Sequence, residues 1–155
     1  MNNANKIEFN DVHDGDFEEL FQIRISSMKD SLSAIGRFDP QRARERLKES
    51  FRANETKFIL YNDEKAGFFA CTENSDRIFI NHLYIIPGMQ SLGIGKHVLN
   101  SIKGYAKVKN VKITLLALKK SKANDFYKNN GFEWIYSQEW DNEYQWDPKG
   151  ANTNA

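Results

Sequence analysis

The fold is decided by the stretch Leu83-Tyr84-Ile85-Ile86-Pro87-Gly88-Met89-Gln90-Ser91-Leu92-Gly93-Ile94-Gly95-Lys96. It predicts a buried strand that ends at a proline, a short loop, and a helix whose first turn contains two glycines. The unpaired N–H groups at the start of such a helix, together with the positive end of its dipole, form a site for a phosphate-type anion. Glycine is needed there because a side chain would hold the ligand away from the backbone. Lys96 adds a positive charge near the same place.

Two familiar phosphate-binding motifs do not fit this stretch. A P-loop requires a glycine five residues before Gly-Lys and a hydroxyl residue after it, but these positions hold Gln90 and His97. A dinucleotide-binding fingerprint requires a third glycine at the position of Val98. Both motifs are therefore excluded.

The stretch instead resembles the acyl-CoA signature of the GNAT superfamily of N-acetyltransferases, in which (Gln/Arg)-x-x-Gly-x-(Gly/Ala) follows a strand ending in Val/Ile-x-Pro. Gln90, Gly93, Gly95 and the run Ile85-Ile86-Pro87 fall in register with it. Further along stands Ala123-Asn124-Asp125-Phe126-Tyr127-Lys128-Asn129-Asn130-Gly131-Phe132, similar to the family's Ala-x-x-Phe-Tyr-x-x-x-Gly-Phe. The resemblance is specific from Leu83 to Phe132 and covers the chain more loosely from Ile7 to Trp146.

Hydrophobic periodicity and turn residues predict the order βααβββαβαββ. The strands are expected at Ile7–Val12, Lys57–Tyr61, Ala66–Thr72, Arg77–Ile86, Val111–Leu118, Phe132–Trp140 and Glu143–Trp146. The helices are expected at Asp16–Lys29, Pro40–Phe51, Gly93–Ala106 and Ala123–Asn129, and Asp39 is expected to cap the second of them, with Pro40 at its first position. This order predicts a single α/β domain. The resemblance implies that it is a GNAT-like domain over residues 1–146 with a mixed, mostly antiparallel sheet flanked by helices. Residues 147–155 are expected to form a flexible tail.

Composition narrows the classes of partner. Twenty-two basic and 21 acidic residues leave a formal charge of +1, so we expect binding neither to nucleic acid nor to a membrane surface. Cys71 is the only cysteine, which excludes an internal disulfide and a cysteine cluster for zinc, and we expect it to be a buried packing residue and no metal to be needed. The first ten residues lack the apolar core of a signal peptide, so a cytoplasmic protein is expected.

The resemblance implies acetyl-CoA as co-substrate and assigns the residues that would bind it. Main-chain groups of the strand would pair with the pantetheine amides, and main-chain amides of the loop and helix start would hold the pyrophosphate. These positions are Leu83, Tyr84, Ile85, Gln90, Ser91, Leu92, Gly93, Ile94, Gly95 and Lys96. The asparagine that the family often has seven residues before the tyrosine is Lys120 here, and Asn124 would substitute for it in contacting the cofactor. Lys119, Lys120 and Lys122 either approach the phosphates or the adenine side of the cofactor or form a solvated cluster.

Catalytic roles also follow from the resemblance. Tyr127 matches a tyrosine near the thioester sulfur, where a phenol protonates the departing thiolate; the alternative is that Tyr127 only packs over the cofactor. The positions that often hold a Glu or His base are Asn81 and Phe79 here, and neither can take a proton. Asn81 would orient a water that relays the proton from the amine. His82, on the opposite face of the strand, is expected to be structural.

The acceptor is expected to be a small amine or a peptide, and its identity is left open. Candidate acceptor-binding residues are Arg24, Met28, Arg37, Phe38, Tyr136 and Trp140. Either arginine would bind a carboxylate of the acceptor, and the apolar segment 31–38 would form a substrate wall. A homodimer through Trp134, Trp140 and Trp146 is possible. The predicted activity is direct acetyl transfer from acetyl-CoA to a primary amine; the alternative is a non-catalytic acyl-CoA sensor or protein-interaction module of the same fold.

Overall fold

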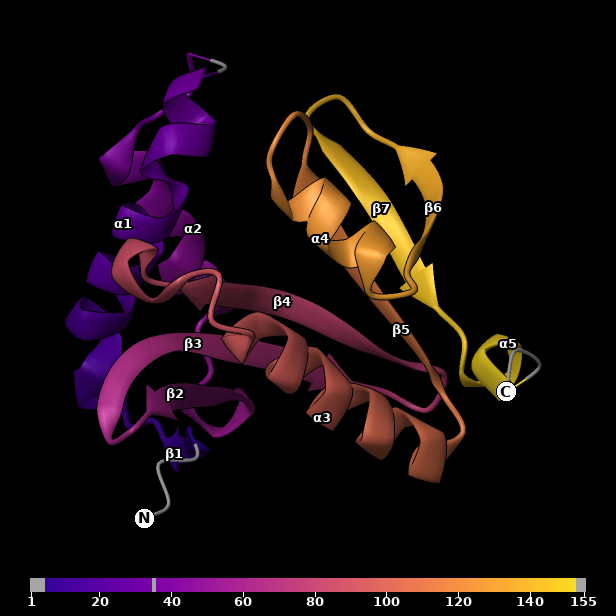
Figure 1. Ribbon diagram of the computed structural model, residues 1–155. Coiled ribbons are helices and arrows are strands. Elements are labelled where there is room, and N and C mark those ends of the chain that lie inside the picture. The colour runs from indigo at the N-terminus through magenta and orange to yellow at the C-terminus, as the bar shows by residue number, and fades with distance from the viewer. Residues whose placement is uncertain (1–4, 35, 153–155) are drawn as a thin grey trace. The chain divides into compact units, whose positions relative to one another are not determined.

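The computed structural model describes residues 5–34 and 36–152 (Figure 1). Seven strands form one sheet in the order β1-β2-β3-β4-β5-β7-β6 among these residues. The strands are β1 (Ile7–Asp11), β2 (Thr56–Tyr61), β3 (Glu64–Glu73), β4 (Arg77–Ile85), β5 (Lys112–Leu118), β6 (Glu133–Ser137) and β7 (Asp141–Trp146). The helices are α1 (Phe17–Ala34), α2 (Pro40–Ser50), α3 (Ile94–Lys109), α4 (Ala123–Asn129) and α5 (Pro148–Asn152).

The sheet is mostly antiparallel. Antiparallel ladders join β1 to β2, β2 to β3, β5 to β7 and β6 to β7, whereas β4 and β5 run parallel from Arg77↔Lys112 to Ile80↔Leu115. The predicted α/β class and the predicted order of strands and first four helices are confirmed. By contacts, the chain divides into unit 1 (Met1–Ala70 and His82–His97) and unit 2 (Cys71–Asn81 and Val98–Ala155).

The core of unit 1 lies between its helices and its strands. It consists of Val12, Leu20, Phe21, Ile23, Ala43, Leu47, Phe58 and Phe68. Asp39 caps α2 by accepting a hydrogen bond from the Arg42 N–H, and Pro40 occupies the first turn, as the sequence predicts. Burial of this apolar stripe is the main force that holds the two helices against the sheet.

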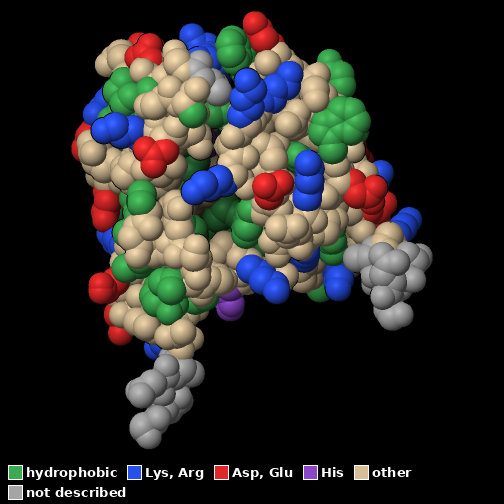
Figure 2. Space-filling view, turned by 45° about the horizontal axis from the view of Figure 1, so that its top comes forward, with side chains coloured by type: hydrophobic (Ala, Val, Ile, Leu, Met, Phe, Trp, Pro, Cys, Tyr) green, Lys and Arg blue, Asp and Glu red, His purple; other side chains and the backbone are tan. Residues whose placement is uncertain are grey.

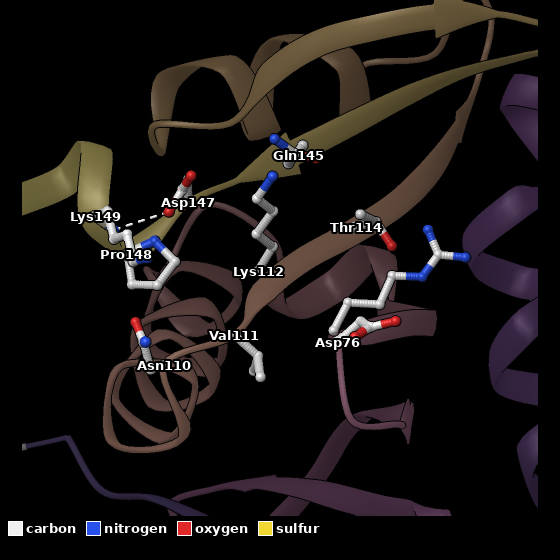
Figure 3. A pocket seen from close by; sticks show the side chains of 10 residues that line it. Asp76, Asn110, Val111, Lys112, Thr114, Gln145, Asp147, Pro148 and Lys149 are labelled. Atoms are coloured by element: carbon white, nitrogen blue, oxygen red, sulfur yellow. Dashed lines mark hydrogen bonds between the residues drawn. The ribbon is translucent and has the colours of Figure 1, made fainter.

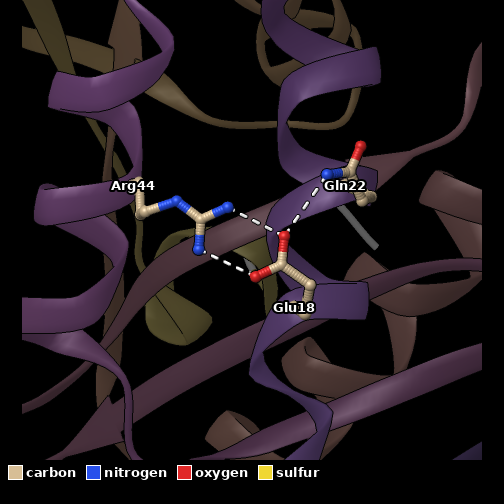
Figure 4. Close-up of polar contacts among 3 residues, drawn as sticks. All are labelled: Glu18, Gln22 and Arg44. Atoms are coloured by element: carbon tan, nitrogen blue, oxygen red, sulfur yellow. Dashed lines mark hydrogen bonds and ion pairs between the residues drawn. The ribbon is translucent and has the colours of Figure 1, made fainter.

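A polar clasp adds to this packing of α1 and α2 (Figure 4). Arg44 donates from both terminal nitrogens to the two carboxylate oxygens of Glu18, each at 2.8 Å, and this bond lowers the pKa of Glu18. Gln22 donates to the same carboxylate at 3.4 Å. The Arg44 guanidinium also lies 4.1 Å from the ring centroid of Phe21. The clasp therefore links α1 to α2 beside their apolar contact.

In unit 2, β5 contacts β7 and α4, and buried side chains of the two strands form its core. Tyr144 and Leu115 are 1% exposed, and Ile113 is fully buried. Trp146 is buried too, so the prediction that it contributes to a dimer surface is wrong. Trp134 and Trp140 are exposed. Figure 2 shows a face on which cationic and anionic side chains are interspersed, as the balanced composition suggests.

Several element boundaries differ from the prediction. α1 continues to Ala34 instead of ending near Lys29, because no helix breaker occurs before Gly36, whose φ of +72° suits glycine. β6 ends at Ser137 because β7 begins already at Asp141 and the residues between them turn the chain.

α5 occupies part of the segment predicted to be a flexible tail, and Cys71 is half-buried rather than buried. Residues 153–155, Ile35 and the first four residues lie outside the described part.

Candidate active site

The predicted phosphate loop joins β4 to α3 within unit 1. β4 ends at Ile85, a short 3-10 turn follows at Pro87–Met89, and α3 begins at Ile94. The Ile86 N–H donates to the Ala66 carbonyl at 2.8 Å, which ties the end of the strand to β3. The local structure therefore has the predicted sequence of strand, proline turn and helix.

The main-chain donors of this loop are open. In the described part of the chain, the N–H groups of residues 91–96 donate no hydrogen bond, and the first bond of the helix runs from His97 N–H to the Gly93 carbonyl. Ser91 and Gly93 have φ values of +66° and +81°, a left-handed conformation that turns successive amides to one side. An added Cβ on Gly93 would meet no atom within 4 Å. Donors, helix dipole and open space together suit an anionic group.

Gln90 supports the loop with its side chain instead of obstructing it. Its amide nitrogen donates to the Ile85 carbonyl at 2.9 Å, and the Ser27 hydroxyl donates to the same carbonyl at 3.2 Å. Ser27 also bonds the Ile23 carbonyl at 2.7 Å within α1. The loop, β4 and α1 are thus joined at one oxygen atom. Nothing local in the sequence indicates the part played by Ser27.

Gly67 is a second residue that sequence reasoning missed. It lies on β3, and a Cβ at this position would collide with the Tyr84 carbonyl oxygen. Only glycine allows the two backbones to approach so closely. Gly67 therefore positions the main chain of Tyr84, one of the three strand residues predicted to pair with the co-substrate.

A polar cluster of unit 1 surrounds His82. Its Nδ1 lies 3.4 Å from Arg24 Nη1 and 3.3 Å from the Tyr84 hydroxyl, and its Nε2 lies 3.2 Å from the Ser50 hydroxyl. Burial, and secondly the positive charge of Arg24, lower the pKa of His82 to about 3. The imidazole is therefore neutral at physiological pH, and both of its nitrogens have partners within the protein.

Asn81 points to a different environment from that of its neighbour His82. In unit 2, its amide nitrogen donates to the Thr72 hydroxyl at 2.7 Å. This bond fixes the amide, and its carbonyl oxygen accepts no hydrogen bond from the described residues. The geometry is compatible with accepting a hydrogen bond from a water, which is the role predicted for this residue.

The second signature forms α4 in unit 2, as predicted. Tyr127 is 6% exposed, and its ring lies 5.6 Å from Phe132 and 6.4 Å from Tyr144, centroid to centroid. Its carbonyl accepts from the N–H groups of Asn130 and Phe132 at 3.1 and 3.0 Å, which closes the helix before Gly131. Tyr127 is thus held by both its ring and its backbone.

The side chain of Asn124 is fully engaged inside unit 2. Its nitrogen donates to the carbonyls of Leu118 and Ser121, both at 2.9 Å, and its oxygen accepts from the Tyr144 hydroxyl at 2.9 Å and from Asn142 at 3.0 Å. These contacts favour a structural role that positions α4. The predicted contact between Asn124 and the cofactor stays a prediction.

The predicted acceptor-binding residues have contrasting environments. In unit 1, Arg24 is buried, and Met28, Arg37 and Phe38 are half-buried. In unit 2, Tyr136 and Trp140 are exposed. Lys120 and Lys122 are exposed and Lys119 is half-buried, so the lysine cluster is largely solvated. Met28 lies on α1 together with Arg24, and Phe38 lies next to Arg37 in the loop that follows α1.

Unit 2 also has a polar cavity of about 450 Å³ that neither signature lines (Figure 3). Asp76, Arg77, Lys112 and Asp147 give it mixed charge, and the Thr114 hydroxyl has no hydrogen-bond partner there.

No group of three or more His, Cys, Asp or Glu side chains that could hold a metal ion is found among the described residues. None of the described helices has the length and apolar character needed to span a bilayer.

The sequence of residues 28–146 matches the family described as Acetyltransferase (GNAT) domain. The chain therefore belongs to the GNAT acetyltransferase family, and the predicted resemblance is confirmed. A search of curated proteins found no match.

Solved structures agree with this assignment at the level of fold. The PaiA N-acetyltransferase of Thermoplasma acidophilum, in complex with coenzyme A, has a TM-score of 0.76 and 18% identity, covering 92% of this chain and 99% of its own. Naa50 of Arabidopsis thaliana, in complex with the bisubstrate analogue CoA-Ac-MVNAL, has a TM-score of 0.62 and 21% identity, covering 90% and 97%. N-acetylglutamate synthase of Neisseria gonorrhoeae, with coenzyme A and N-acetyl-glutamate, has a TM-score of 0.64 and 14% identity, covering 94% of this chain and 36% of its own. The coenzyme A ligands of these structures agree with acetyl-CoA as the co-substrate.

Proposed function

We propose that this chain transfers an acetyl group from acetyl-CoA directly to a primary amine carried by a small molecule or a peptide. The observation that supports this most is the row of open N–H donors at residues 91–96 in the loop of a GNAT acetyltransferase. A diphosphate needs several donors at once, and a helix start with left-handed residues before it supplies them without a side-chain contribution.

In this proposal the residues have distinct tasks. The main-chain amide near Ile85 stabilises the negative charge that develops on the carbonyl oxygen during attack. Tyr127 donates a proton to the leaving thiolate. The Asn81 carbonyl oxygen, fixed by the bond to Thr72, orients a water through which the amine passes its proton to bulk solvent. A relay of this kind is needed because an alkyl amine is mostly protonated at neutral pH.

The proposal is tested first by binding and then by turnover. Calorimetry with acetyl-CoA and with coenzyme A should show binding, and release of free thiol should then depend on the amine in a panel of amino acids, polyamines and peptides. Binding without amine-dependent thiol release would favour a non-catalytic acyl-CoA sensor instead. Absence of binding by well-folded protein would refute both.

A further inference from the structure

Arg24 is the only charged side chain that is buried in the described part of the chain, with 7% of its surface exposed. It lies near the middle of α1 and belongs to unit 1. Burying a guanidinium is unfavourable unless an opposite charge and hydrogen bonds replace the lost water. A buried arginine therefore requires an explanation.

No carboxylate of the described residues compensates this charge. The ion pairs found there are Lys6–Glu8, Arg44–Glu18, Lys57–Asp11 and Lys65–Glu19. Arg24 Nε is buried without a hydrogen-bond partner, and Nη1 makes the single contact of 3.4 Å with His82. A guanidinium has five N–H donors in a fork that matches a carboxylate. Most of that capacity is unused.

The groups around Arg24 are neutral. His82 is an uncharged imidazole that Ser50 and Tyr84 hold in place. The Tyr84 ring centroid lies 5.8 Å from the guanidinium carbon, which gives a weak cation–π contact. None of these groups carries the negative charge that the guanidinium lacks. The cluster orients Arg24 while leaving its charge available.

Arg24 also lies over the segment of β4 predicted to bind the co-substrate. Ser27, three residues further along α1, donates to the Ile85 carbonyl, and Arg24 contacts His82 and Tyr84 of the same strand. The anion that pairs with Arg24 would thus lie beside the strand at which transfer is proposed. Arg37, the other arginine predicted to bind the acceptor, is only half-buried and already has a partner.

We propose that Arg24 binds a carboxylate of the acceptor, so that the substrates are amines that carry a carboxylate, such as amino acids. This inference rests on the proposed acetyl transfer and names its substrate class. Arg24 is then a specificity-determining residue that discriminates a carboxylate from the uncharged amide of the same shape.

The first test measures binding without turnover. The probes are N-acetyl amino acids, which mimic the product, and the corresponding C-terminal amides, titrated in the presence of coenzyme A. We expect the wild type to bind the acids about tenfold more tightly than the amides. Arg24→Met should abolish this preference, Arg24→Lys should keep part of it, and the exposed Arg42→Met should leave it unchanged. Undetectable binding of the acids, equal binding of both forms, or a preference that survives Arg24→Met would overturn the inference.

The second test separates recognition from structural support. If the charge of Arg24 serves a ligand, Arg24→Met without ligand should melt at or above the temperature of Arg42→Met, because an uncompensated buried charge is removed while His82 keeps Tyr84 and Ser50 as partners. A Tm clearly below that of the control would assign Arg24 to structure and overturn the inference. Acid preference without thiol release would refute the proposed transfer, and with it the substrate class, but would leave Arg24 as a carboxylate-binding residue.

Discussion

The turn that leads into α3 and the turn that leads into α4 differ in what happens to their main-chain donors. Both follow a strand, and both contain a residue with positive φ, Gly93 in one and Lys120 in the other. From Ser91 to Lys96, through the first turn of α3, the N–H groups donate to nothing in the described chain. At the start of α4, the N–H groups of Ser121, Asn124 and Phe126 donate to nearby carbonyls.

This difference fits the separate roles proposed for the two turns. Open main-chain donors can contribute to binding only if a ligand accepts their hydrogen bonds, because an N–H group that loses its water and stays unpaired costs free energy. In the turn that leads into α4, the N–H groups of Ser121, Asn124 and Phe126 bond nearby carbonyls, which holds the helix and thereby fixes a side chain such as Tyr127. We infer that the first turn binds and the second turn positions.

The largest effect is expected from Gly93→Ala. The left-handed φ disfavours alanine, and the added methyl group would project into the open space beside the donors. We expect acetyl-CoA affinity, measured by calorimetry, to fall by about a hundredfold. Gly88→Ala is the matched control, because a Cβ there also meets no atom but the glycine lacks a positive φ. Equal losses in both variants would contradict a role of the left-handed Gly93 conformation in binding.

The second effect concerns the turn that leads into α4. Asn124→Ala removes the acceptor of the Tyr144 hydroxyl, which is buried, and also the donor to the carbonyls of Leu118 and Ser121. We expect the free energy of unfolding, measured by urea denaturation, to fall by about 2 kcal/mol. The exposed Asn129→Ala on the same helix should change it by less than about 0.5 kcal/mol. Loss of acetyl-CoA affinity without loss of stability would show that Asn124 contacts the cofactor after all.

The third prediction concerns Tyr127 and its proposed role as the proton donor to the thiolate. Tyr127→Phe should lower turnover by at least about tenfold while acetyl-CoA affinity changes little, because only the proton donor is lost. Tyr105→Phe, which removes an exposed hydroxyl bonded to Glu73, should leave turnover unchanged. Steady-state kinetics with the best acceptor of the panel supplies the measurement. Near-normal turnover of Tyr127→Phe would show that the Tyr127 hydroxyl is not the proton donor and that the residue contributes packing only.

The contrast between the two turns also marks how far the sequence could predict the structure. Strand, proline, glycines and helix follow one another within residues 83–96, so local propensities suffice to predict that region, and the same holds for α4. Ser27 and Ile85, Arg24 and His82, and Gly67 and Tyr84 are distant in sequence. Their contacts depend on how α1 and β3 pack against β4, and no local pattern records that packing. The end of α1 was missed because amphipathic periodicity fades where a helix becomes exposed.

The smallest effect tests the support of the open turn. Gln90 and Ser27 both donate to the Ile85 carbonyl, so removing either leaves the other. Gln90→Ala and Ser27→Ala should each weaken acetyl-CoA binding by about threefold, whereas the double variant should lose more than the product of the two, because the carbonyl then has neither donor. Ser26→Ala is the control, since its hydroxyl bonds only the Ile23 carbonyl within α1. If the two single effects simply multiply, the carbonyl does not couple the residues, and the loop depends on its own backbone geometry rather than on this anchor.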